Sequence, residues 1–235
     1  MTFLTESRPG TALVTGAAGG LGYWISEYLM AMKWDVIHYD LSSGCDVRNP
    51  GGRGLREPPH TLDVLINCAG VNMINWLPDV TEDEWDLVMD TNAKGIFRMT
   101  QWCLPALTRS KGTILNIVSN ASHMPMRCSL AYNASKGAAH IMTLQLAREL
   151  FQRYGITVFG ISPNKLAETG MSDDIDRQVM KTRGWSRDEA REYQLKGLAI
   201  GEETDPEQLA EFIAFLLSTK HRHKYLHGCI LPYGA

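Results

Sequence analysis

The fold is decided by the stretch Thr15-Gly-Ala-Ala-Gly-Gly-Leu-Gly22, which joins a short β-rich run at 11–15 to a helical apolar stripe at 20–33. Glycines at such a junction allow a tight turn and let the backbone N–H groups of the helix N-terminus approach a pyrophosphate. Asp40 follows the next β-rich run, 18 positions after the last glycine. A carboxylate there can accept hydrogen bonds from ribose hydroxyls and would repel a 2′-phosphate. The stretch therefore predicts a dinucleotide site that takes NAD.

The rest of the chain alternates β-rich and helical segments, the pattern of βαβ units with parallel strands. The β-rich runs lie at 11–15, 35–39, 62–67, 112–119, 156–161 and 226–231. Helices are predicted at 20–33, 81–109 with a break allowed inside it, 129–154 and 205–218. No internal repeat or low-complexity linker divides the chain. We therefore expect one α/β domain over 1–235, a Rossmann-type doubly wound parallel sheet with helices on both faces.

Two segments depart from this alternation. Residues 48–60 carry three glycines and three prolines and cannot hold a regular helix. Residues 164–200 are charged and lie between a strand and a helix, and they include the flexible apolar side chains of Met171 and Met180. We expect the second segment to form a mobile lid over a substrate.

Composition and charge exclude several classes of protein. The 23 Lys and Arg residues against 26 Asp and Glu residues give a net charge of −3. Nucleic acids and anionic membranes attract proteins with a basic excess, so we expect neither partner. No apolar run approaches the ~20 residues that span a bilayer, and Met1 to Gly10 lacks the apolar core of a secretory signal. The five cysteines form no C-x-x-C pair, which favours a reducing, cytoplasmic location.

The residues with the clearest chemistry are Ser119, Tyr132 and Lys136. Tyr132 and Lys136 are four positions apart in a predicted helix and project from one face. The lysine ammonium, together with a bound nicotinamide cation, would stabilise the phenolate and lower the tyrosine pKa from its ordinary value near 10. Ser119 ends a strand at the edge where α/β sites form and can hold a carbonyl or hydroxyl oxygen. The alternative is a packed tyrosine beside a solvated lysine.

At these residues the chain resembles the short-chain dehydrogenase/reductase family. The glycine stretch matches Thr-Gly-x-x-x-Gly-x-Gly, Asn67-Cys-Ala-Gly70 matches Asn-x-Ala-Gly, and Tyr132 to Lys136 matches Tyr-x-x-x-Lys. Ser119 has the family spacing of 13 residues before the tyrosine. The resemblance covers essentially the whole chain. It implies a sheet of about seven parallel strands, NAD(P) binding and redox chemistry between an alcohol and a carbonyl.

The resemblance also implies a role for each matching residue. Tyr132 is the general acid/base, Lys136 lowers its pKa, and Ser119 holds the substrate oxygen. Asn92 stands where the family has its catalytic asparagine, and Asp46-Val47 looks like the pair that contacts adenine. The expected cofactor-binding residues are Gly16, Gly19, Gly20, Leu21, Gly22, Asp40, Leu41, Asp46, Val47, Asn67, Ala69, Gly70, Tyr132, Lys136, Pro163 and Leu166.

Some positions depart from the family pattern. The usual Pro-Gly after the sixth strand is Pro163-Asn164, and the threonine expected a few residues later falls at Glu168, with Thr169 one position on. Cys68 replaces an asparagine, and we interpret it as a packing residue. The glycines also satisfy the pattern of an extended branch of the family. The length of 235 residues leaves no room for its extra substrate domain, so we expect the compact type.

Several hypotheses stay open at this stage. His123 is either an exposed loop histidine or a substrate contact, and no metal is expected at His221, His223 and His227. The resemblance implies a homodimer or homotetramer associating through 92–109 and 130–154. The leading function is an NAD-dependent oxidoreductase acting on a small alcohol or ketone. The alternatives are a catalytically silent cofactor-binding regulatory protein and a non-redox lyase or isomerase on the same fold.

Overall fold

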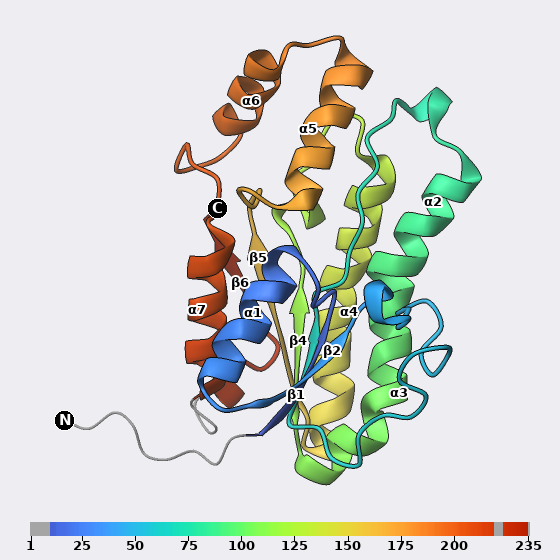
Figure 1. Ribbon diagram of the computed structural model, residues 1–235, viewed down its shortest axis with the longest axis vertical. Coiled ribbons are helices and arrows are strands. Elements are labelled where there is room, and N and C mark those ends of the chain that lie inside the picture. The colour runs from blue at the N-terminus through green and yellow to red at the C-terminus, as the bar shows by residue number, and fades with distance from the viewer. Residues whose placement is uncertain (1–9, 219–222, 235) are drawn as a thin grey trace, which may run out of the picture.

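The computed structural model describes residues 10–218 and 223–234, and in these residues six parallel strands form one sheet (Figure 1). The strand order is β2-β1-β3-β4-β5-β6. The strands are β1 (Thr11–Thr15), β2 (Asp35–Tyr39), β3 (Val64–Asn67), β4 (Thr113–Ile117), β5 (Thr157–Pro163) and β6 (Ile230–Tyr233). This doubly wound arrangement confirms the predicted fold class. The order reverses between β1 and β3, and ligands of such sheets bind at that switch point, beyond the carboxyl ends of the strands.

The helices cover both faces of the sheet (Figure 1). They are α1 (Gly20–Ala31), α2 (Glu82–Met89), α3 (Gly95–Ser110), α4 (Leu130–Tyr154), α5 (Gly170–Arg183), α6 (Arg187–Lys196) and α7 (Pro206–Ser218). Alternate residues of each strand point to opposite faces, so the two cores interleave along it. In β1, Ala12 and Val14 pack with α1 and α7, whereas Leu13 packs with α3 and α4.

The sheet has six strands where the resemblance implied about seven. The six β-rich runs read from the residues correspond to the six observed strands, and the extra strand is the one that no run predicted. Between β2 and β3 the chain forms a short 3-10 helix, Leu41–Ser43, and then turns. Gly44 and Gly51 take positive φ angles of 78° and 79° there. The glycines and prolines of 48–60 therefore leave β2 as the edge of the sheet.

Two other boundaries differ from the prediction. The helix expected over 81–109 is divided by a π-helical turn, Asp90–Lys94, which fits the break allowed there. The last strand, expected at 226–231, is shorter and later, because His223–Leu226 forms a 3-10 helix before β6 begins. Leu226 is apolar because it packs against the core from that turn. His221 lies outside the described residues.

The segment 164–200 folds as two helices beyond the carboxyl ends of the strands, at the top of Figure 1. Its side chains Val179 and Ala190 are buried with Ile74 in a small third core. Lys165 forms ion pairs of 2.7 Å with Asp176 and 2.8 Å with Glu203, which join the start of the segment to α5 and to the chain beyond it. The segment therefore covers the edge where the strand order reverses.

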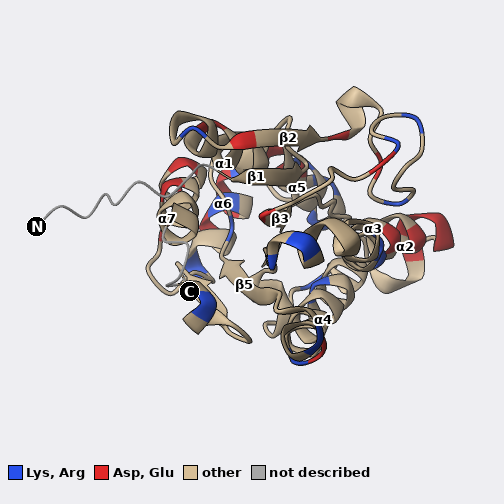
Figure 2. Cartoon of the chain, turned by 90° about the horizontal axis from the view of Figure 1, so that it is seen from below, with Lys and Arg blue, Asp and Glu red and all other residues tan. Residues whose placement is uncertain are grey.

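Charges of both signs are spread around the outside of the molecule, and acidic residues gather on α2 (Figure 2). Among the described residues, no helix combines the length and the apolar character needed to cross a bilayer.

Candidate active site

The glycine stretch forms the turn between β1 and α1, and its glycines are required by geometry. Gly16 and Gly20 have positive φ angles of 69° and 51°, which side-chain-bearing residues rarely adopt. A Cβ on Gly22 would lie 2.2 Å from the carbonyl oxygen of Gly16, and a Cβ on Gly19 would meet nothing within 4 Å. The first turn of α1 has no acidic residue and no side-chain cap. These free N–H groups beside open space fit an anionic diphosphate.

Thr15 ties this turn to the one after β3. Its buried hydroxyl accepts hydrogen bonds of 3.0 Å from the N–H groups of Cys68 and Ala69 and donates to the carbonyl oxygen of Ile66. The two turns on either side of the switch point are therefore fixed relative to each other. Asn67 donates 2.8 Å to the side-chain oxygen of Asn116 on β4, which extends the link across the sheet.

Asp40 lies at the carboxyl end of β2 and faces the glycine turn. Its carboxylate accepts hydrogen bonds of 3.2 Å from the Ala18 N–H and 2.9 Å from the Ser42 N–H. Partial burial opposes ionisation, but the hydrogen bonds from Ser42 and Ala18 outweigh it and hold the pKa of Asp40 below its ordinary value. An ionised carboxylate therefore lies next to the turn, and the neighbouring Leu41 side chain is exposed.

Asp46 and Val47 follow on the same side. Val47 is buried, and its side chain lies within 3.3 Å of the position that a Cβ on Gly95 would take. The Asp46 carboxylate receives the guanidinium of Arg48, with a 2.8 Å contact from Nη2, and Arg48 lowers its pKa by these hydrogen bonds. The sequence did not predict this pairing, and an adenine at Asp46 would have to share the carboxylate with Arg48.

Asn92 lies in the π-helical turn between α2 and α3 and is buried. Its amide oxygen accepts 2.8 Å from the Val71 N–H, and its amide nitrogen donates 2.8 Å to the Val71 carbonyl oxygen. The same nitrogen donates 3.0 Å to the hydroxyl of Ser135 on α4. Asn92 thus joins three segments, and a Cβ on Gly70 would lie 3.4 Å from its oxygen and 3.9 Å from the Lys136 Nζ.

Tyr132, Lys136 and Ser119 meet at the carboxyl end of β4. The Lys136 Nζ lies 5.8 Å from the centroid of the Tyr132 ring and donates 2.9 Å to the carbonyl oxygen of Ile117. Burial raises the pKa of Tyr132, and a hydrogen bond with Ser119 opposes this shift. Burial lowers the pKa of Lys136 to about 8. The four expected catalytic residues are therefore brought to one edge of the sheet.

Pro163 is buried at the end of β5, and Leu166 packs against the core on the α1 side. The unexpected Asn164 is also buried, and its amide donates 2.7 Å to the carbonyl oxygen of Gly234. Thr169 caps α5 with a 3.1 Å hydrogen bond from the Ser172 N–H. A Cβ on Gly20 would meet the Thr169 side chain at 3.6 Å, so Thr169, rather than Glu168, faces the glycine turn.

Three contributors were not predicted as such: the Thr15 hydroxyl, Ser135 and Asn116. Each acts between elements that are far apart in the chain, and no local pattern signals such a contact. The spacing Tyr132-x-x-Ser135 could have drawn attention to Ser135, because it lies on the first turn of α4 beside Lys136. Its hydroxyl also donates 2.8 Å to the carbonyl oxygen of Tyr132.

His123 is exposed and interacts with the Ser122 hydroxyl at 3.1 Å, so both interpretations of His123 stay open. His223 interacts with Thr113 at 2.8 Å, and His227 accepts from the Val158 N–H. Among the described residues, no group of three potential metal ligands is found.

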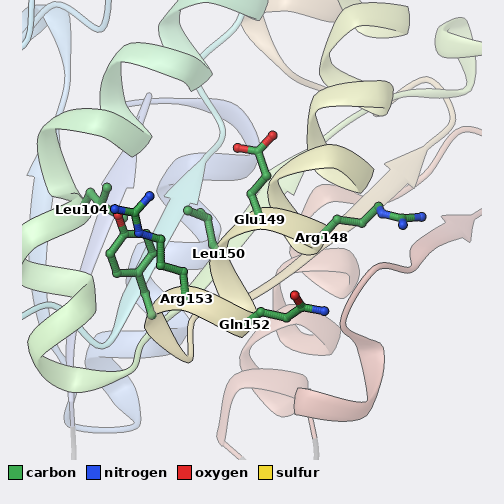
Figure 3. Close-up of a pocket in the computed structure, with 7 residues that line it drawn as sticks. Leu104, Arg148, Glu149, Leu150, Gln152 and Arg153 are labelled. Atoms are coloured by element: carbon green, nitrogen blue, oxygen red, sulfur yellow. The ribbon is translucent and has the colours of Figure 1, made fainter.

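A surface hollow lies elsewhere, between α3 and the last turns of α4 (Figure 3). It is lined by Leu104, Arg148, Glu149, Leu150, Gln152, Arg153 and Tyr154. Arg148 follows Lys136 by 12 residues on α4, roughly 18 Å along the helix axis. The hollow is therefore separate from the residues described above.

Comparisons with known proteins agree with this geometry. The profile of the short chain dehydrogenase family matches residues 54–179. The 3-oxoacyl-[acyl-carrier-protein] reductase FabG of Staphylococcus epidermidis is 34% identical over 72% of this chain, and the match spans only 63% of that relative. The (3R)-3-hydroxyacyl-CoA dehydrogenase of Homo sapiens is 30% identical over 90% of this chain and 89% of its own length.

A solved structure is similar over nearly its whole length. It is that of a putative 2-deoxy-d-gluconate 3-dehydrogenase from Agrobacterium tumefaciens with bound NADP, which has a TM-score of 0.78 and 26% identity and covers 96% of this chain and 95% of that one. The family match covers just over half of the chain and falls on the segments that carry Asn92, Ser119, Tyr132 and Lys136. The chain belongs to the short-chain dehydrogenase family.

Proposed function

We propose that this protein is an NAD-dependent oxidoreductase that interconverts a secondary alcohol and a ketone by hydride transfer. The observation that carries the proposal is the convergence of Ser119, Tyr132 and Lys136 at the carboxyl end of β4, next to the glycine turn. A general acid and an oxygen-binding hydroxyl there stand beside a cradle that fits a dinucleotide.

The residues divide the chemistry between them. Ser119 holds the substrate oxygen, and the Tyr132 hydroxyl gives that oxygen a proton in reduction or takes one from it in oxidation. When bound, the nicotinamide supplies or takes up the hydride at the carbon, so that a ketone, a hydride and a proton balance one alcohol. The Lys136 ammonium stabilises the phenolate form of Tyr132. Asn92 positions α4 through Ser135.

The preference for NAD over NADP rests on Asp40. Its ionised carboxylate faces the turn where the adenosine ribose of a dinucleotide lies, and it would repel a 2′-phosphate. The cation nearest in sequence, Arg48, is paired with Asp46. The Agrobacterium structure named above holds NADP, so relatives of this fold differ in cofactor. The direct test measures both cofactors with one substrate.

We also propose a homodimer or homotetramer. Trp102 and Leu104, which the sequence offered as surplus apolar groups, pack against the core instead, and Cys103 is buried. The apolar side chains left exposed on the same two helices are Phe97 on α3 and Ile141 on α4. Light scattering at micromolar concentration tests this proposal, and a monomer would contradict it. The five cysteines all have free thiols, which supports a reducing cytoplasm as the location.

The decisive experiment is a screen of alcohols with NAD⁺ and of ketones with NADH, followed at the nicotinamide absorbance band. We expect a change in absorbance that depends on both substrate and enzyme. A regulatory protein would bind cofactor without turnover. A lyase or isomerase would form product with no net change in absorbance, so product analysis by mass spectrometry completes the comparison.

A further inference from the structure

An unusual number of large apolar side chains is exposed around the candidate active site. Five of them form what we call the apolar rim: Trp76, Leu77, Met124, Met126 and Met171, which are 47%, 69%, 46%, 44% and 36% exposed. They come from three separate segments, the loop after β3, the loop after β4 and the first turn of α5. Apolar surface gathered at one place marks a binding site.

Hydrogen bonds join these three segments into one structure. The Asn75 N–H donates 2.8 Å to the Cys128 carbonyl oxygen, which connects the first loop to the second. The indole N–H of Trp76 donates 3.3 Å to the carbonyl oxygen of Thr182, and the Thr182 hydroxyl donates 3.0 Å to that of Ile74. These two bonds connect the first loop to α5.

The rim is also connected to the catalytic residues. Asn133, the residue after Tyr132, donates its amide protons to the carbonyl oxygens of Ala121 at 2.7 Å and Met124 at 2.8 Å. Met171 follows Thr169 by two residues, and the Thr169 side chain faces the glycine turn at Gly20. The apolar rim therefore runs from the tyrosine to the nucleotide cradle.

The charges around the rim do not form a site for a polyanion. Over 71–80 and 120–130 the only groups charged at neutral pH are Asp79 and Arg127, which sum to zero with histidine neutral. On α5, Asp174 pairs with Arg177 at 3.1 Å, and Asp176 pairs with Lys165. The Arg183 guanidinium stacks over the aromatic rings of α6 and its approach and donates to a backbone carbonyl.

We propose that the substrate is an uncharged ketone or secondary alcohol with a hydrocarbon chain, and that the apolar rim binds this chain while Ser119 and Tyr132 hold the oxygen. This proposal rests on the proposed function. Polyols would leave the rim exposed, and thioesters of anionic carriers would find no concentrated positive charge there. Three of the five rim residues are methionines, whose flexible side chains adapt to chains of different shape.

The test is a chain-length series of methyl ketones, 2-butanone, 2-hexanone and 2-octanone, with NADH and with NADPH. A fully buried methylene is worth ~0.8 kcal/mol, about fourfold in kcat/KM. Because the rim is half exposed, we expect about half of that free energy, or on the order of 10-fold from 2-butanone to 2-octanone. Glucose and acetoacetyl-CoA serve as the polyol and the anionic thioester.

The variant Met124→Gln with Met126→Gln keeps side-chain length and removes the apolar character. We expect it to flatten the chain-length dependence while turnover of 2-butanone changes by less than about threefold. Met30→Gln is the matched control, because Met30 is 40% exposed on α1, away from the rim, and should leave the dependence unchanged.

Each other result overturns the proposal. Turnover of glucose or acetoacetyl-CoA with no gain along the ketone series would refute the substrate class and leave the proposed function standing. An unchanged chain-length dependence in the double variant would show that the rim does not hold the chain. A second copy of this chain on the rim would instead appear as a lower mass of the double variant by light scattering. No turnover of any compound, in either direction, would refute both proposals.

Discussion

Lys136 lies one helical turn after Tyr132 on α4, with its Nζ 5.8 Å from the centroid of the tyrosine ring. The lysine is buried and donates to the carbonyl oxygen of Ile117 at the end of β4. The sheet therefore fixes the ammonium group, and the helix fixes the phenol relative to it. Two rigid elements hold the pair, which is the arrangement that a preorganised acid/base site needs.

Removing the phenol proton should abolish most of the activity. Tyr132→Phe keeps the ring and its packing but has no proton to exchange with the substrate oxygen. We expect kcat to fall by at least ~10²–10⁴-fold, the range of general acid–base catalysis. NAD binding, measured by calorimetry, should persist. Near-normal turnover in a folded Tyr132→Phe protein would remove Tyr132 from its role.

The buried ammonium group makes stability depend on pH. Burial lowers the pKa of Lys136 from 10.5 to about 8, so the unfolded chain binds more protons between these two values. Its contribution to the free energy of unfolding is therefore fully present above about pH 10.5 and is lost as the pH falls to about 8. Below that pH it stays constant.

Lys136→Met tests this dependence, since methionine fills similar space without a charge. We expect the variant to gain stability over the unmodified protein at pH 7, by up to about 3 kcal/mol, and the gain to shrink toward pH 10.5. Urea unfolding at pH 7, 9 and 10.5 measures the difference. A difference independent of pH would show that Lys136 titrates at its ordinary pKa. The variant should also bind NAD more weakly.

Asn92 should matter more for stability than its partner Ser135. Asn92→Ala leaves the N–H and the carbonyl oxygen of Val71 without their buried partner, whereas Ser135→Ala removes a single acceptor of Asn92. We expect losses of about 2–3 kcal/mol and about 1 kcal/mol in the free energy of unfolding. Urea denaturation of both variants measures them. Equal losses would mean that the Val71 groups are satisfied by other partners.

The segment 164–200 should open more easily than the sheet. Its own core contains only a few buried side chains, and capping and ion pairs supply most of its other contacts. In hydrogen exchange followed by mass spectrometry, peptides of α5 and α6 should exchange faster than those of β4. NAD⁺ with 2-octanone, which cannot react because both are oxidised, should slow them. Protection equal to that of β4 without ligand would rule out a mobile lid.

The sequence predicts most of the sheet, because strands covered on both faces are continuous apolar runs between turn residues. It fails where apolar residues serve another purpose. Leu226 packs against the core from a 3-10 turn, so the last strand was placed too early. The seventh strand came from the resemblance alone, and the glycines and prolines of 48–60 give no run that could form it.

The candidate site shows the same division. Residues with their own chemistry, such as Tyr132 and Asp40, are found from motif and position. Residues that act by contact are not, because the contact joins distant parts of the chain: Ser135 to Asn92 spans 43 residues, and Thr15 to Cys68 spans 53. The direction of a side chain is also missing from the sequence, and the path of Arg48 onto Asp46 could not be foreseen.

Asp40 should decide between the two nicotinamide cofactors. The carboxylate is ionised and fixed by the N–H groups of Ala18 and Ser42, so it cannot turn away without losing both bonds. NADP would bring a phosphate of charge near −2 to within a few ångströms of it. Arg48 cannot compensate while it neutralises Asp46. We expect NAD to be preferred by at least ~10²-fold in kcat/KM, about 2.7 kcal/mol.

Asp40→Ala should narrow this preference, chiefly by weakening NAD, because the hydrogen bonds to the ribose are lost together with the repulsion. Asp46→Ala is the informative companion, since it frees the Arg48 guanidinium for a 2′-phosphate. The double variant should therefore favour NADP more than either single change does. Steady-state kinetics with both cofactors and one substrate measure all four proteins. Equal efficiency with NAD and NADP in the unmodified protein would show that the carboxylate of Asp40 does not face the ribose.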